Sequence, residues 1–307
     1  MNCLQIRLFG GVQVVLDGQG IAPFPTRWAS GLLAYLALKN GKLLHRDVLA
    51  ALFWPEESDT RARKSLRNAL WRLRSIIEPP GVQPGAFLTV TGKSVGLTGT
   101  GSVSLDVEDF DRLVSIGCEK DLDEEELDSL EECLRLYRGD FMDGHDFAWC
   151  VQERERLRLS LLTVLERLMA YHLQRGEWSS AIQRGKTLLG HDPFREHVHR
   201  CLMVCHHSMG DRPLAIRQYR ECERLLREEM GLAPMEATER LFQEIQGGAR
   251  HLDDPDALML FLASSRMEQR MTDALARAEE ALADLRRLAE GARQSDGTQE
   301  QPEHPPH

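Results

Sequence analysis

Residues 59–77 are the segment that most constrains what this chain can fold into. Read as a helix, they place one stripe of apolar side chains on a single side, made of Ala62, Leu66, Ala69, Leu70, Leu73, Ile76 and Ile77. The other side carries six lysine or arginine residues, with no acidic residue between Arg61 and Glu78. Such a helix can pack on a core and present cations to the phosphates of a duplex. The alternative is a solvated surface helix whose arginines bind nothing.

Two shorter helices are predicted upstream. The first spans residues 27–39, ends at Asn40-Gly41 in the manner of a glycine C-cap, and has an inward face of Leu32, Leu33, Leu36 and Ala37. The second spans 46–53 and has an inward face of Val48, Leu49 and Leu52. It stops at Trp54-Pro55 because proline disfavours helical geometry in the residue before it. Ser58 or Asp59 is expected to cap the basic helix that follows.

Short β-prone runs lie on both sides of these helices. Residues 4–8 and 12–16, followed by an Asp17-Gly18 turn, predict a hairpin at the start of the chain. Residues 87–90 and 95–98 predict a second hairpin with Lys93 in its tip. Strands, three helices with a basic third, and a closing hairpin make a winged helix-turn-helix. We predict that this domain spans residues 1–100.

The charges of the chain are segregated. Residues 1–100 carry twelve lysines and arginines against six acidic residues, whereas the whole chain has a formal net charge of −10. The N-terminal part can therefore approach nucleic acid even though the chain as a whole is acidic.

The basic helix supplies the candidate DNA contacts. We expect base edges to be faced by Lys64, Ser65, Asn68 and Arg72, and phosphates to be held by Arg61, Arg63, Arg67 and Arg74. Lys93, with Thr91 and Ser94, would contact the minor groove or the backbone from the hairpin tip. Trp71 flanks the apolar stripe, and we favour packing against the hairpin strands over a DNA contact for it.

Several motifs resemble those of SARP-type bacterial transcriptional regulators. In the DNA-binding half they are Ala-Tyr-Leu-Ala-Leu at 34–38, Leu-Phe-Trp-Pro at 52–55 and the run at 65–74. In the half resembling the bacterial transcriptional activator domain they are Tyr-Arg-Gly-Asp-Phe at 137–141 and Trp149 followed by Glu-Arg-Glu-Arg-Leu at 153–157. The resemblance covers roughly residues 4–245.

The resemblance implies an OmpR-type winged helix followed by tetratricopeptide-like helical hairpins. It also implies that the third helix enters the major groove and that residues 54–58 touch RNA polymerase, through Trp54, Glu56 and Glu57. An activator is therefore expected, acting on double-stranded DNA as a homodimer at least when bound there.

The second half shows an internal repeat without reference to any family. Residues 168–182 align with residues 202–216, so that Met169, Gly176 and Ala181 fall on Met203, Gly210 and Ala215. The offset of 34 residues is the tetratricopeptide period. With helical segments around 105–115, 124–138 and 150–174 before the repeats, we predict a domain at 104–246 that presents a surface for a partner.

The C-terminal residues show a different pattern. Apolar residues recur every three or four positions, at Met267, Met271, Leu275, Ala278, Leu282, Leu285 and Ala289. Residues 254–291 are therefore predicted to form an amphipathic helical appendage, which either dimerises as a coiled coil or folds back on the helical domain. Residues 292–307, with three prolines and no larger apolar residue than Ala292, are predicted to be disordered.

No pattern indicates an enzyme, a cofactor or a metal. Gly185-Lys186-Thr187 lacks the earlier glycine of a phosphate-binding loop, and Cys201 and Cys205 fall on positions that the repeat buries. Seven cysteines without a framework, and no apolar run of transmembrane length, lead us to expect a cytoplasmic, nucleoid-associated protein.

The predicted fold is mainly α with a small β component, and the predicted function is sequence-specific regulation of transcription. The alternatives are a helical-repeat adaptor whose winged helix binds protein instead of DNA, and a sensor whose repeats bind a small molecule.

Overall fold

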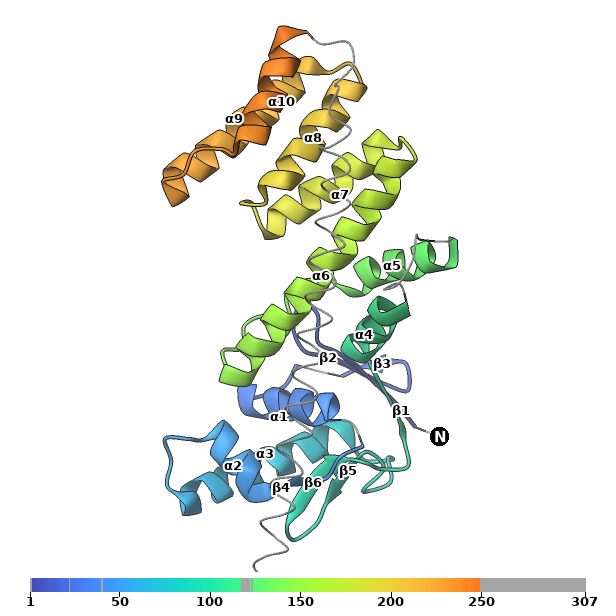
Figure 1. The fold of residues 1–307 in the computed structure, drawn as a ribbon. Coiled ribbons are helices and arrows are strands. Elements are labelled where there is room, and N and C mark those ends of the chain that lie inside the picture. The colour runs from blue at the N-terminus through green and yellow to red at the C-terminus, as the bar shows by residue number, and fades with distance from the viewer. Residues whose placement is uncertain (1, 22, 40, 117–121, 123, 249–307) are drawn as a thin grey trace, which may run out of the picture. The chain divides into compact units, whose positions relative to one another are not determined.

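The computed structural model describes residues 2–21, 23–39, 41–116, 122 and 124–248 of the chain (Figure 1). The chain divides into two compact units, residues 1–171 and residues 172–307. All strands and helices α1 to α5 belong to the first unit, whereas α7 to α10 belong to the second. None of the helices formed by the described residues combines the length and the apolar content that crossing a bilayer requires.

A four-stranded sheet begins the first unit. Its order is β3-β2-β1-β7, with β1 (Cys3–Arg7), β2 (Gln13–Leu16), β3 (Gln19–Gly20) and β7 (Ser102–Leu105). β1 and β2 are antiparallel, with Leu4 opposite Leu16, which confirms the predicted hairpin. Asp17 (φ 48°) and Gly18 (φ 82°) turn the chain from β2 into β3, as a tight hairpin requires. β7 pairs in parallel with β1 and was not predicted from the sequence.

Three helices follow this hairpin, namely α1 (Arg27–Leu38), α2 (Arg46–Phe53) and α3 (Asp59–Ile77). The predicted inward residues of α1 are all buried. The prediction for α2 is wrong at Val48, which is 58% exposed. Ala50 and Phe53 are buried with Leu49 instead, because the larger Phe53 ring turns that side of the helix toward Tyr35 and Phe147.

The wing is a small sheet of order β4-β6-β5, formed by β4 (Leu44–His45), β5 (Leu88–Val90) and β6 (Ser94–Leu97). Val90 lies opposite Val95, so the predicted hairpin with Lys93 in its tip is confirmed. β4 was not predicted, because a strand of two residues leaves no alternation to detect.

The rest of the first unit is helical, with α4 (Asp106–Ile116), α5 (Glu124–Leu136) and most of α6 (Ala148–Gln174). Asp106 anchors this part to the first sheet, since its carboxylate accepts hydrogen bonds from the backbone N–H groups of Leu8 (2.8 Å) and Phe9 (3.2 Å). Arg138 lies 3.2 Å from the same carboxylate. Burial raises the pKa of Asp106, and these donors oppose that effect.

A loop between α5 and α6 packs against α1 and α2. Arg154 holds the loop by donating to the carbonyl oxygens of Phe141 (2.9 Å) and His145 (2.8 Å). The Phe147 ring then lies 5.4 Å from Trp28 and 5.2 Å from Phe53, measured between centroids. A Cβ atom on Gly31 would clash with this ring, so the close approach requires glycine there. The motifs at 137–141 and 153–157, which carried the family resemblance, therefore meet where Arg154 donates to the Phe141 carbonyl oxygen. Together they hold the loop against α1 and α2.

The described residues of the second unit form α7 (Trp178–His191), α8 (Glu196–Ser208), α9 (Arg212–Met230) and α10 (Glu236–Gly247), and the turn at Gly210 makes α8 and α9 a helical hairpin. The predicted repeat of 34 residues is confirmed at its key positions. Gly176 and Gly210 both have positive φ, 71° and 79°, and Ala181 and Ala215 are both fully buried.

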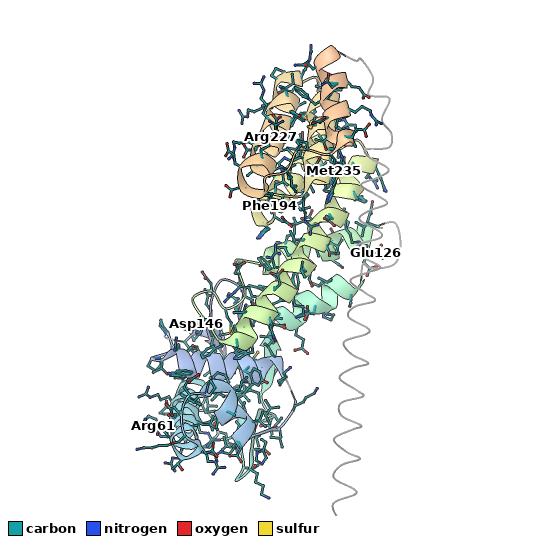
Figure 2. The ribbon with its side chains drawn as sticks, turned by 60° about the vertical axis from the view of Figure 1, so that its left-hand side comes forward. Arg61, Glu126, Asp146, Phe194, Arg227 and Met235 are labelled. Carbon is teal, nitrogen blue, oxygen red and sulfur yellow. The ribbon has the colours of Figure 1, made fainter. Side chains whose placement is uncertain are left out.

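A buried polar network joins α8 to α10. The Glu196 carboxylate accepts a hydrogen bond from the backbone N–H of Met235 (2.7 Å) and another from the Thr238 hydroxyl. Arg200 donates to the same hydroxyl at 2.9 Å. Figure 2 labels Met235 and Phe194, which stand just before these two helices.

The fold class is confirmed as mainly helical, with a β-containing winged region first and helical repeats after it. The exact domain limits stay a prediction. The predicted appendage at 254–291 and the predicted tail at 292–307 lie outside the described residues.

Candidate nucleic-acid interface

The basic helix α3 forms as the sequence predicts. It covers Asp59–Ile77, with Ser58 as N-cap residue and Asp59 in the first turn, where a negative charge suits the helix dipole. The Ser58 side chain makes no capping hydrogen bond. Of the predicted stripe, Ile76 is half-buried and the others are buried, so this side fixes α3 to the core.

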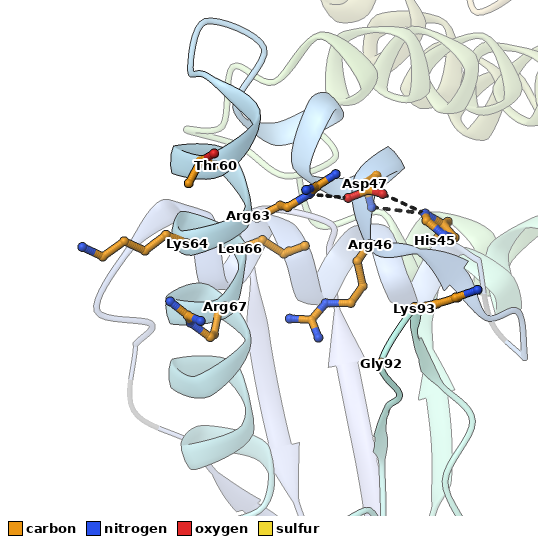
Figure 3. Close-up of a pocket in the computed structure, with 10 residues that line it drawn as sticks. All are labelled: His45, Arg46, Asp47, Thr60, Arg63, Lys64, Leu66, Arg67, Gly92 and Lys93. Atoms are coloured by element: carbon orange, nitrogen blue, oxygen red, sulfur yellow. Dashed lines mark hydrogen bonds and ion pairs between the residues drawn. The ribbon is translucent and has the colours of Figure 1, made fainter.

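A groove runs between α3, the start of α2 and the tip of the wing (Figure 3). Its volume is about 740 Å³, and it is lined by His45, Arg46, Asp47, Thr60, Arg63, Lys64, Leu66, Arg67, Gly92 and Lys93. Five of these residues are lysine or arginine and one is acidic. The groove therefore gathers cations from three separate elements, as an interface with a polyanion requires.

The single acid of the groove is paired. Asp47 Oδ1 accepts a hydrogen bond from Arg63 Nε at 2.7 Å, and His45 Nδ1 lies 3.7 Å from the other carboxylate oxygen (Figure 3). This hydrogen bond and the charge of Asp47 raise the pKa of Arg63. Arg63, a predicted phosphate contact, is thus tied to α2.

Five of the predicted contact residues on α3 are exposed, and their side chains make no hydrogen bond or ion pair within the described part of the chain. They are Arg61, Lys64, Arg67, Asn68 and Arg72. Figure 2 shows Arg61 projecting from the surface of the first unit. Unpaired cations at an exposed surface leave the field of α3 uncompensated on its outer side.

Besides Arg63, two further predicted contact residues have partners inside the protein. The Ser65 hydroxyl donates to Glu57 Oε2 at 3.0 Å. Arg74 donates from Nη2 to the carbonyl oxygen of Leu88 at 2.9 Å, and its Nε lies 3.3 Å from Glu78 Oε2. Arg74 therefore joins α3 to β5.

Two hydrogen bonds hold the wing tip. The Thr91 hydroxyl accepts from the backbone N–H of Ser94 at 2.9 Å, and the backbone N–H of Arg46 donates to the Lys93 carbonyl oxygen at 2.9 Å. The Lys93 side chain is exposed. Arg46 reaches into the groove from α2 (Figure 3).

The three residues expected to touch RNA polymerase differ in accessibility. Trp54 is 7% exposed, with its ring centroid 5.1 Å from that of Trp28. Glu56 is exposed, and Glu57 is half-buried beside Ser65.

Sequence reasoning missed Arg46, and it was wrong about Trp71. Arg46 is the first residue of α2 and Asp47 follows it directly, so the first turn of this helix has no net positive charge that would single out Arg46 in the sequence. Trp71 does not pack on the wing strands, because Arg74 occupies that contact and leaves the Trp71 side chain 72% exposed.

Comparison with known proteins shows what this chain is similar to. The model of the bacterial transcriptional activator domain matches residues 105–246. Regulatory protein AfsR of Streptomyces coelicolor is 26% identical over 80% of this chain and 24% of its own length. Regulatory protein DnrI of Streptomyces peucetius is 26% identical over 75% of this chain and 88% of its own length. The chain thus spans about a quarter of AfsR and most of DnrI.

A solved structure shows a similar fold. Mycobacterium tuberculosis EmbR, in complex with a low affinity phosphopeptide, matches with a TM-score of 0.65 at 21% identity and covers 90% of this chain and 72% of its own. Together with the domain match, these relatives confirm the resemblance to SARP-type transcriptional regulators.

Proposed function

We propose that this chain, in which residues 105–246 match the bacterial transcriptional activator domain, is a transcriptional regulator that binds specific sequences of double-stranded DNA. The observation that carries the proposal is the cationic groove between α3, α2 and the wing, together with the unpaired basic side of α3. The names of the relatives, regulatory proteins and transcriptional regulators, agree with it.

We group the proposed DNA contacts by where they lie and by whether they already have a hydrogen-bond partner within the protein. We assign base edges to Lys64, Asn68 and Arg72, which are exposed and unpaired within the described residues. We assign phosphates to Arg61, Arg67, Lys93 and, in addition to the residues expected from the sequence, Arg46, whereas Arg63 is held by Asp47. Ser65 and Arg74 support this surface without contacting DNA, since the Ser65 hydroxyl is hydrogen-bonded to Glu57 and Arg74 is hydrogen-bonded to the Leu88 carbonyl oxygen.

Activation would follow from recruitment of RNA polymerase next to the bound site. Within residues 54–58, the carboxylates of Glu56 and Glu57 are the proposed contacts, because Trp54 belongs to the aromatic packing around Trp28. We further expect two copies of the chain on one operator, with two half-sites as the consequence.

A salt series of mobility-shift experiments on the full chain tests the DNA proposal. Genomic fragments are incubated with the protein between 50 and 300 mM salt, and the retained fragments are sequenced. We expect a small set of fragments to persist while bulk binding is lost, because base contacts survive the screening that removes phosphate attraction.

The adaptor alternative gives a different result in the same experiment. A winged helix that binds protein would retain no fragment at any salt concentration. Retention of all fragments to the same extent would show a non-specific cationic surface and would contradict sequence-specific regulation.

A further inference from the structure

Trp71 stands apart from the other tryptophans of this chain. Its side chain is 72% exposed, the largest exposed fraction among the large apolar residues that the structure describes. The other four, Trp28, Trp54, Trp149 and Trp178, are buried or half-buried. An indole on the surface keeps a large apolar area in water, so its position calls for a physical reason.

The neighbours of Trp71 on α3 are the proposed DNA contacts. Asn68 precedes it by three residues, Lys64 by seven, and Ser75 follows it by four, which places all of them on one side of the helix. Lys64, Asn68 and Ser75 are exposed as well. The indole makes no hydrogen bond or ring contact within the described residues.

The wing does not explain the residue either. Arg74 makes the contact between this part of α3 and β5, through the carbonyl oxygen of Leu88. No contact among the described residues of the first unit therefore gives Trp71 a structural role, and its exposed side chain lies on the same side of α3 as Lys64 and Asn68.

The dimensions of duplex DNA fit this arrangement. Seven residues of helix rise by roughly 10 Å, and the major groove is about 12 Å wide, so Lys64 and Trp71 can both lie within one groove. The apolar group that base pairs present in this groove is the C5-methyl group of thymine.

We propose that the Trp71 indole packs on a thymine methyl group in the major groove and is a specificity-determining residue. This inference rests on the proposed function, because it requires that α3 enter the groove. It adds an apolar contact to a surface whose other members act through charge and hydrogen bonds.

The test removes the methyl group and the indole separately. An operator is selected from random duplexes with the wild-type full chain, and each thymine is replaced in turn by deoxyuridine. Dissociation constants are measured by fluorescence anisotropy for the wild type, Trp71→Ala and Trp71→Phe. The matched control is Val48→Ala. Val48 lies on α2 in the first unit and is 58% exposed, so this variant removes an exposed apolar side chain that is not on α3.

We expect one thymine at which deoxyuridine weakens wild-type binding about fourfold, the effect of losing one buried methyl-sized group. At that position Trp71→Ala should lose the sensitivity, Trp71→Phe should keep part of it, and Val48→Ala should keep all of it. The salt dependence of Trp71→Ala should equal that of the wild type, because no phosphate contact is removed.

Each contrary result has a distinct meaning. A wild-type chain that selects no duplex would overturn the proposed function itself. A Trp71→Ala chain with unchanged affinity and an unchanged deoxyuridine profile would overturn only the methyl contact, as would uniform weakening with the sensitivity retained. Loss of polymerase binding with normal DNA binding would make Trp71 a protein contact and would equally overturn it.

Discussion

The Nε atom of Arg63 on α3 lies 2.7 Å from Oδ1 of Asp47 on α2, inside the groove that the basic residues surround. This pair links the two helices at the proposed DNA interface, and it also neutralises one of five cations there. The groove is therefore less positive than its arginine and lysine content suggests, and the pair limits how tightly it holds any phosphate backbone.

Replacing Asp47 by Asn should strengthen DNA binding. The variant removes the only acidic residue that lines the groove and frees Arg63 for a phosphate. We expect non-specific affinity to rise severalfold at 50 mM salt, and the slope of log K against log salt to steepen by about 0.9, the value for one additional phosphate contact. Anisotropy titrations with a random-sequence duplex measure both quantities.

Asp109→Asn is the matched control for this prediction. Asp109 also pairs with an arginine of the first unit, Arg112 at 3.0 Å, but on α4 and outside the groove. An unchanged slope in Asp47→Asn, or an equal gain in Asp109→Asn, would contradict the role given to the Arg63 pair.

Glu78 should be essential for the wing. Its carboxylate is 1% exposed and accepts hydrogen bonds from the backbone N–H groups of Gly85, Phe87 and Leu88, at 2.9, 2.9 and 2.8 Å. Replacing it by Ala leaves these buried donors and Arg74 without their acceptor, which should cost about 2–4 kcal/mol of wing stability.

Hydrogen exchange reports this loss locally. The amides of Phe87 and Leu88 should exchange much faster in Glu78→Ala, while amides of the second unit keep their rates. Glu56→Ala, which removes an exposed carboxylate of the first unit, should leave both sets unchanged. Protected wing amides in Glu78→Ala would show that the carboxylate is dispensable.

The stability of the second unit should depend on His199. Its Nε2 donates to the Pro193 carbonyl oxygen at 3.0 Å, and its Nδ1 accepts from Gln218 at 2.7 Å, which is the neutral tautomer. Burial lowers the pKa of His199 below its ordinary value of 6.5, despite the nearby Glu221 and Glu196.

The direction of the pH effect follows from this shift. Below about pH 6.5 the unfolded chain binds a proton at His199 that the folded chain does not yet bind. Stability from this residue is therefore complete above that pH and is lost as the pH falls toward the folded pKa. Burial also lowers the pKa of His206, so His199 accounts for part of the effect.

Calorimetry at pH 7.5 and pH 5.5 tests this prediction. The melting temperature of the second unit should fall at the lower pH, and it should fall less in His199→Gln, whose amide can replace both hydrogen bonds without titrating. His45→Gln, at a half-exposed position of the first unit, is the control. An equal pH effect in the wild type and His199→Gln would exclude His199 as its source.

The parts of the fold that follow from local periodicity were predictable. α3 has its predicted limits and an inward face close to the predicted one, because six of the seven stripe residues are buried. The 34-residue repeat was visible because Gly176 and Gly210 both need positive φ, which favours glycine at corresponding positions.

The errors arise where distant segments decide the packing. Val48 is exposed because Phe53 turns α2 toward a ring, Phe147, nearly a hundred residues away. β7 escaped detection since its partner β1 is far from it along the chain. Within the candidate site, the sequence could not show whether Arg74 or Trp71 contacts β5. The answer depends on how α3 is rotated about its own axis relative to the wing.

The salt dependence of operator binding by Lys64→Ala and Arg67→Ala tests the central claim most directly. Both residues are exposed on α3 and line the groove, whereas the matched control Arg135→Ala removes an exposed arginine of α5. We predict weaker binding in both variants and a slope that flattens by about 0.9 in Arg67→Ala, where one phosphate no longer meets a cation, with the control unchanged. Wild-type affinity and slope in both groove variants would contradict the conclusion that α3 binds the duplex.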